Sequence, residues 1–202
     1  NDNWSTGFLL HYSFLDIKSD NNNDKFLDNP LMKNFVGINR WKYSNDSTGL
    51  QGQIGVEGVL RNTIGGQLDY EKNQEIDTLN PWGAQTDISR LKVWGKIGKV
   101  FLSDPGKSIG FQFSATTYDQ KSVFGLNKYN AKQNSGYANL IFQDIMGTTD
   151  NVYSVGASLM ADEYLENVNG KDYSRNEITP GVFGEYTYSG TQNFKAVAGL
   201  RV

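Results

Sequence analysis

Oxygen-bearing side chains gather between Asp20 and Asp28, in the stretch DNNNDKFLD. The candidate metal ligands are Asp20, Asn22, Asp24 and Asp28. Calcium loops place carboxylate and amide oxygens at alternate positions because the chain must wrap around the ion. However, Lys25 stands where an EF-hand loop needs glycine, and no glutamate closes the loop. The spacing therefore predicts either a calcium site or a solvated Asn/Asp loop without metal.

Aromatic and acidic side chains share a second polar stretch, residues 61–89. Tyr70 and Trp82 are the aromatic candidates for ligand binding. The acids of this stretch are Asp69, Glu71, Glu75 and Asp77. Such groups at a loop tip contact a ligand or a partner protein in many binding sites, and they equally often pack a loop against its neighbours. Both interpretations stay open at this point.

Catalytic motifs are absent from the sequence. His11 is the only histidine, so a histidine metal site or acid–base centre would need partners that the sequence lacks. There is no G-x-S-x-G, no H-E-x-x-H and no phosphate-binding loop. We therefore expect a protein that is not an enzyme and that requires no cofactor. The net charge of −3 gives no electrostatic case for nucleic-acid binding.

The elements that must position these groups are β-strands. In Arg90–Asp119, apolar residues alternate with polar ones on both sides of an Asp-Pro-Gly turn. A period of two is typical of a strand with one apolar and one polar face. The same alternation predicts nine strands in all. They are 4–14, 35–43, 50–60, the two strands of 90–119, 136–145, 153–161, 178–188 and 194–202. His11 falls on the polar parity of the first strand.

Connection lengths distinguish between all-β architectures. The predicted gaps alternate long and short, with long gaps at 15–34, 61–89, 119–135 and 162–177. Alternation places all long loops at one end of an up-and-down meander, as in outer-membrane barrels. Soluble sandwiches mix connection types because their strands cross between sheets. No apolar run approaches the roughly 18 residues of a transmembrane helix.

The predicted fold is an all-β, antiparallel up-and-down transmembrane β-barrel. Bacterial single-chain barrels have even strand numbers, and an open sheet in lipid leaves two costly unpaired edges. We therefore expect residues 1–202 to be one partial barrel domain, about nine strands of a larger barrel. A closed small barrel of eight of these strands is the alternative. Aromatic residues near strand ends, Trp4, Trp41, Tyr43, Tyr153 and Tyr186 among them, suggest interfacial girdles or ordinary β-propensity.

Several short motifs, in this order, resemble the barrel of TonB-dependent outer-membrane receptors of the Bacteroidetes type. They are Asp24-Lys-Phe-Leu-Asp-Asn-Pro30, Asn39-Arg-Trp-Lys-Tyr43, Ile64-Gly-Gly-Gln67, Phe124-Gly-Leu-Asn127, Pro180-Gly-Val-Phe-Gly-Glu-Tyr186 and Ala198-Gly-Leu-Arg201. The resemblance extends over nearly all of the chain, but each motif is short.

The resemblance implies outer-membrane import of a scarce nutrient, of the iron-siderophore, haem or cobalamin class. It implies outer-membrane lipid, the nutrient ligand and a surface lipoprotein as partners, and a TonB complex reached through a plug outside these residues. The candidate calcium would then lie in an extracellular loop. The alternatives are a barrel independent of TonB, such as a porin-like channel or a secretion component, and a soluble carbohydrate-binding β-sandwich. In a sandwich the apolar face would be buried against another sheet.

Overall fold

Antiparallel strands make up most of this protein, because most of its segments alternate apolar and polar side chains. A computed structural model describes residues 3–73, 81–191 and 194–202. The strands are β1 (Trp4–Leu15), β2 (Leu31–Asn45), β3 (Leu50–Gly66), β4 (Gly83–Phe101), β5 (Asp104–Phe124), β6 (Asn127–Ile145), β7 (Asn151–Val168), β8 (Lys171–Asp172), β9 (Arg175–Thr191) and β10 (Phe194–Arg201). No helix occurs among the described residues.

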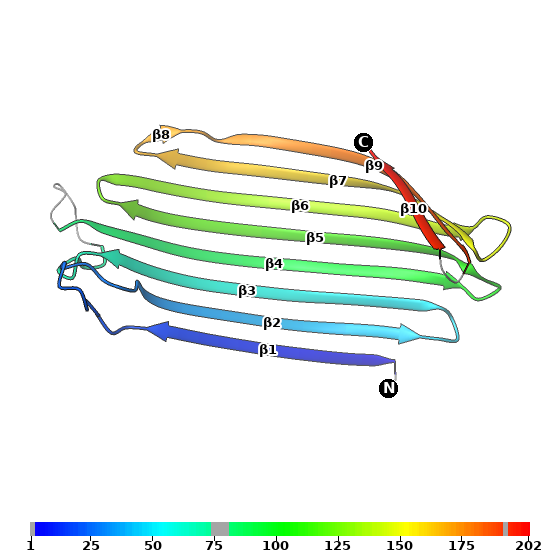
Figure 1. Cartoon of the computed structure of the whole chain (residues 1–202), viewed down its shortest axis with the longest axis horizontal. Helices are drawn as coiled ribbons and strands as arrows, with labels where there is room; N and C mark the ends of the chain where they lie inside the picture. Colours follow the sequence, from blue (N-terminus) through cyan, green and yellow to red (C-terminus); the bar gives the residue numbers. More distant parts are fainter. Residues whose placement is uncertain (1–2, 74–80, 192–193) are drawn as a thin grey trace.

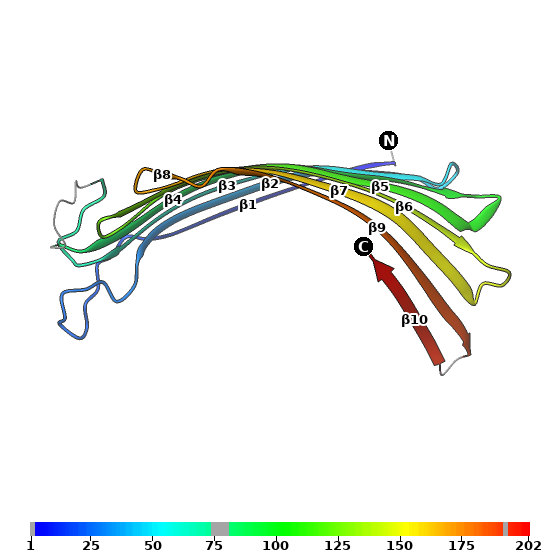
Figure 2. The same ribbon diagram turned by 90° about the horizontal axis from the view of Figure 1, so that it is seen from above.

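All ten strands belong to one antiparallel up-and-down sheet, which confirms the predicted all-β class and strand arrangement. The strands lie side by side in chain order (Figure 1), and only the two-residue β8 lies off this path, paired with β7. The sheet is a single curved layer, as Figure 2 shows. In the described part of the chain the curve is not closed, and β1 and β10 form its two edges.

The strands are longer than the sequence pattern predicts. β5 contains 21 residues, which span roughly 70 Å at 3.3–3.4 Å per residue. The apolar alternation ends near Ala115, but the backbone ladder between β5 and β6 continues to the pair Phe124 and Asn127. A strand that is polar on both faces loses the period-two signal while it keeps every backbone hydrogen bond.

Two of the four predicted long gaps are therefore wrong. β5 and β6 extend through 119–135 and meet in a tight turn at Gly125, whose φ is 57°. Similarly, β7 and β9 extend through most of 162–177, and a turn at Asn169 and Gly170, with φ values of 51° and 84°, leads into β8. Asn-Gly suits a tight hairpin because both residues accept a positive φ. The first two gaps are real but shorter than predicted, at 16–30 and 67–82.

Burial identifies the crowded face of the curved sheet. Tyr70 is the only buried apolar side chain among the described residues. Five of the six buried polar residues share the polar parity of their strands: Asn34, Ser122, Asn139, Ser158 and Asp162. The sixth, Gln85, has the other parity and accepts the Asn73 N–H of the second loop. Side chains on the concave face of a single-layer sheet converge and cover one another, so we assign the polar face to the concave side.

Candidate functional site

The strand register assigns an apolar band to one face of the sheet. One row of paired positions joins Phe8, Val56 and Val93 to Ala115 and Ala161 through consecutive strands. Large side chains in this band are exposed: Phe8 is 69% exposed and Leu159 is 49% exposed. The band therefore presents a broad apolar surface that no described element covers.

The apolar band runs obliquely across the strands. At the end away from the short turns, which we call the upper end, the band stops at Phe14 in β1 and at Ala161 in β7. Ala161 is in register with Phe8. The limit thus shifts by six positions over six strand steps, or one residue per strand. With about 3.3 Å per residue and 4.8 Å between strands, the strands tilt by about 35° from the normal of the band. Strands of closed barrels tilt by 35–45° from the barrel axis.

Aromatic rings lie at the end of the band near the short turns. The ring centroids of Trp4 and Tyr43 are 5.0 Å apart, and those of Phe142 and Tyr153 are 6.3 Å apart. The Tyr186 hydroxyl donates to Asn151 Oδ1 at 2.5 Å, beside the turn between β6 and β7. The structure thus places Trp4, Tyr43, Tyr153 and Tyr186 near strand ends, where the sequence analysis expects them.

From β2 to β9, the polar face is divided into three sectors by charge. On β2, β3 and β4 it carries six cations and one carboxylate: Arg40, Lys42, Arg61, Arg90, Lys92, Lys96 and Glu57. On β5 from Ser108 to Phe124, and on β6, it carries no charged residue. On β7 and β9 it carries four carboxylates and one cation: Asp162, Glu166, Glu177, Glu185 and Arg175. A solute along this face therefore meets a basic, a neutral and an acidic wall.

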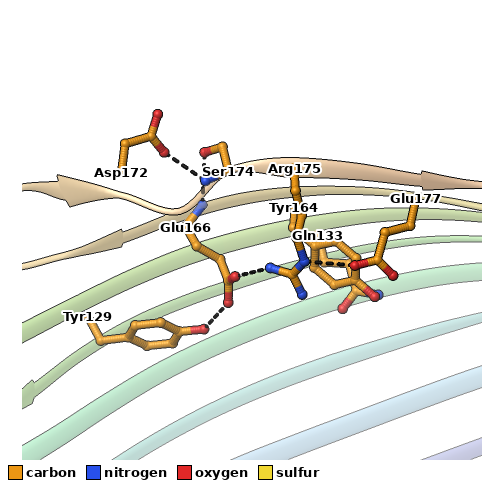
Figure 3. A network of polar contacts seen from close by, with 8 residues as sticks. All are labelled: Tyr129, Gln133, Tyr164, Glu166, Asp172, Ser174, Arg175 and Glu177. Atoms are coloured by element: carbon orange, nitrogen blue, oxygen red, sulfur yellow. Dashed lines mark hydrogen bonds and ion pairs between the residues drawn. The ribbon is translucent and has the colours of Figure 1, made fainter.

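A hydrogen-bonded network lies in the acidic sector, beyond the apolar band (Figure 3). Arg175 Nε donates to Glu177 Oε1 at 2.7 Å, and its Nη1 pairs with Glu166. The guanidinium lies 4.0 Å from the centroid of the Tyr164 ring. Tyr129 donates its hydroxyl hydrogen to Glu166 Oε1 at 2.8 Å. One arginine thus connects β7 and β9, and Tyr129 connects them to β6.

This network shifts the proton affinity of its members. The hydrogen bond from Tyr129, followed by that from Arg175, lowers the pKa of Glu166 below its ordinary value. The same bond, together with desolvation, raises the pKa of Tyr129. Both shifts stabilise an ionised Glu166 and a neutral Tyr129 at neutral pH. No nucleophile and base are paired in this network, so we assign it a structural and electrostatic role.

The candidate calcium ligands lie in one loop, where each carboxylate accepts hydrogen bonds from the loop itself. Asp20 accepts the backbone N–H groups of Asp24 and Lys25, at 3.1 and 3.0 Å. Asp28 Oδ2 accepts from the Ser19 hydroxyl at 2.6 Å, and Asn22 Nδ2 donates to Asp24 at 2.9 Å. Within the described ranges, no group of three or more His, Cys, Asp or Glu residues has the arrangement to hold a metal ion. Calcium binding stays a prediction.

Tyr70 and Trp82 lie in the second loop, and both pack against neighbours. Tyr70 is 4% exposed, and its ring lies against Gly83 at the start of β4. Trp82 is 37% exposed, and its ring centroid is 6.3 Å from that of Phe26 in the first loop. Both rings thus pack against neighbours, and of the two only Trp82 keeps substantial exposed surface. Ligand binding by these residues stays a prediction. Glu75 and Asp77 lie outside the described residues.

His11 is exposed on the polar face of the edge strand β1, opposite Val36. Its position agrees with the predicted parity. The sectors of charge and the network around Arg175 were not predicted from the sequence. The parity of each charged residue assigns it to one face of its strand, and this signal could have shown the sectors. Using it requires the register between neighbouring strands, which the sequence does not supply.

No described helix has the length and apolar character needed to cross a membrane. Comparison with models of known protein families and with curated proteins finds no match to this chain.

Proposed function

We propose that this chain is part of the wall of an outer-membrane β-barrel that imports a scarce nutrient in a TonB-dependent manner. One observation carries the membrane part of the proposal: a continuous exposed apolar band on one face of a sheet whose other face is polar. Lipid covers such a band, and a water-filled lumen solvates the polar face. The nutrient class, an iron-siderophore, haem or cobalamin, comes from the motif resemblance alone.

The dimensions of the band support this location. At a tilt of about 35°, the eight steps from Tyr153 to Ala161 rise roughly 22 Å along the membrane normal, close to the 25 Å height of barrel bands. Aromatic rings at the lower limit, such as Trp4 and Tyr43, suit the interface between lipid and water. The strand segments beyond Ala115 and Ala161 would project into the extracellular medium.

The exposed band also favours a barrel over the soluble sandwich. A sandwich buries its apolar face against a second sheet about 10 Å away. In the described structure the strands form one layer, and Ile54 and Leu159 remain 44% and 49% exposed. An uncovered band of this size on a soluble protein would drive aggregation.

Fractionation and uptake test the two parts of the proposal separately. The full-length protein should be recovered in the outer-membrane fraction and should migrate faster on gels before heating than after it. A strain without the gene should lose uptake of one of the three nutrient classes, and uptake should stop when the proton-motive force is collapsed. Uptake that persists without energy would instead indicate a porin-like channel. Recovery as a soluble protein would overturn the membrane assignment.

A further inference from the structure

Two glycines open a hollow in the basic sector of the polar face. Gly98 on β4 and Gly110 on β5 are directly paired, and both have the polar parity. A Cβ built on Gly110 would meet no atom within 4 Å. The resulting hollow has a volume of about 460 Å³. It lies beside the short turns, across the sheet from the apolar band.

Three cations and three amides surround this hollow. They are Arg40, Lys42, Lys96, Gln51, Gln53 and Gln112. Lys42, Gln53, Lys96 and Gln112 are consecutive partners across β2, β3, β4 and β5. Since cross-strand Cβ atoms are about 5 Å apart, the two lysines stand on either side of Gln53 and reach the same ligand. Amide N–H groups between them supply neutral donors.

The cations at the hollow have no anionic partner in the part of the chain that the structure describes. Arg40, Lys42 and Lys96 are exposed, and none forms an ion pair with a described residue. Glu57, the only carboxylate on the polar face of these three strands, pairs with Arg90. The three like charges on β2 and β4 repel one another, so an anion that joins them relieves this repulsion and gains charge-assisted hydrogen bonds.

The indole ring of Trp94 lies flat against the sheet near the hollow. A Cβ on Gly55 would stand 2.6 Å from Trp94 Cε2 and Cζ2, so the indole covers the Gly55 backbone. Gly55 pairs with Arg40 on one side and with Trp94 on the other. The ring of Trp94 therefore lies over Gly55, and Trp94 is not among the residues that line the hollow.

We propose that this hollow binds a multivalent anion, a polycarboxylate or a phosphate ester, on the inner wall of the barrel. Its positive charge selects anions over neutral solutes, and its glutamine amides add hydrogen bonds. The absence of side chains at Gly98 and Gly110 determines how large an anion it can hold. The site rests on the proposed function only in that the polar face must line a water-filled lumen. It requires neither TonB nor a particular nutrient.

Calorimetric titration of the full-length protein in neutral detergent, with pyrophosphate and separately with citrate, tests the site. We expect saturable binding of both probes that weakens as salt concentration rises. Arg40→Gln or Lys96→Gln should each weaken binding about tenfold, because each removes one charge-assisted contact. Gly110→Leu should abolish binding by filling the hollow, without a change of charge.

Matched variants keep the interpretation unambiguous. Gly58→Leu is the control for Gly110→Leu, since a Cβ at Gly58 also meets no atom within 4 Å and Gly58 lies on the apolar face. Lys99→Gln removes a cation from the opposite face of β4. Heat-modifiable gel mobility establishes that each variant is folded. Absence of saturable binding would overturn the proposal, including the case in which another part of the protein fills the hollow. The proposal would also be overturned if Gly58→Leu lost as much binding as Gly110→Leu. Binding that persists in a protein that fails the uptake test would leave this site standing and the proposed function refuted.

Discussion

The ring of Tyr70 lies directly over the Cα of Gly83, the first residue of β4. Any side chain on Gly83 would enter the space of the ring, and Tyr70 is the one buried apolar residue of the described chain. This contact holds Tyr70 and residues 67–73 around it, the described start of the loop after β3, against the sheet. The loop is also held by the Gln67 N–H, which donates to the Trp82 carbonyl at 2.9 Å.

We expect Gly83→Ala to loosen this loop. Overpacking of this kind costs about 1–3 kcal/mol, and hydrogen exchange of the Gln67 and Tyr70 amides should report that loss as easier local opening. Gly58→Ala is the control, since the site is open. Adding Tyr70→Ala to Gly83→Ala should remove the clash, so the double variant should cost less than the sum of the two single ones. Additive costs would show that the two residues do not interact.

The sequence was sufficient for the fold class because turns and parity leave strong local signals. The parity of Leu50–Leu60 and of Arg90–Asp119 agrees with the observed faces, and the tight turn near 46–49 was expected. The predicted Asp-Pro-Gly turn is misplaced: the chain turns at 102–103, and Asp104 already begins β5. The strand ends were missed where both faces turn polar, as in Thr116–Phe124. There the backbone hydrogen bonds alone maintain the strand, and the side chains show no alternation of apolar and polar residues from which it could be predicted.

The candidate site was less predictable for a different physical reason. Arg40 and Lys96 are far apart in sequence, and only the register across β3 brings them to one hollow. Arg175 and Glu166 are likewise joined by the way β9 returns along β7. By contrast, the Asp20–Asp28 loop was visible in the sequence because its hydrogen bonds are local.

Acid should loosen the first loop by protonating Asp28. The Ser19 hydroxyl and then the Asn21 N–H, which donates at 2.9 Å, lower the pKa of this carboxyl below its ordinary value of 3.8. A lowered folded-state pKa gives stabilisation that is present above the unfolded value and is lost as pH falls through the folded value. We therefore expect protection of the Asn21 amide, corrected for intrinsic exchange, to be constant above pH 3.8 and to fall below it.

Asp28→Asn is the control for this titration, because an amide oxygen still accepts hydrogen bonds but does not ionise. Its Asn21 protection should be lower than in the wild type and flat through the acid range. If the variant showed the same acid transition as the wild type, another group would be responsible.

Arg175 should stabilise the β7–β9 hairpin locally and the whole protein very little. Its ion pairs with Glu166 and Glu177 are exposed, and exposed pairs contribute little to global stability. Arg175→Lys keeps the charge but loses the planar guanidinium, which donates to both glutamates and stacks on Tyr164. We expect faster exchange of the Tyr173 amide, which donates to the Glu166 carbonyl at 2.8 Å, with an unchanged thermal midpoint.

Glu177→Gln provides a graded comparison, since it removes one of the two ion pairs and leaves the stacking. Its effect on Tyr173 exchange should be smaller than that of Arg175→Lys. A large fall of the thermal midpoint in either variant would show that the network supports the sheet as a whole.

Charges placed on the two faces of the sheet should have opposite consequences for membrane assembly. Ile54→Lys and Phe111→Lys would put an ammonium group into lipid, which costs about 2–4 kcal/mol near the midplane and less towards the interfaces. Gln53→Lys and Gln112→Lys, one residue away, place the same charge in the lumen and should assemble normally. Ser158 is a poor control, because it is buried and accepts a hydrogen bond from Arg201 at 3.0 Å. Heat-modifiable mobility and outer-membrane yield measure assembly, and equal yields on both faces would refute the assignment of the apolar band to lipid.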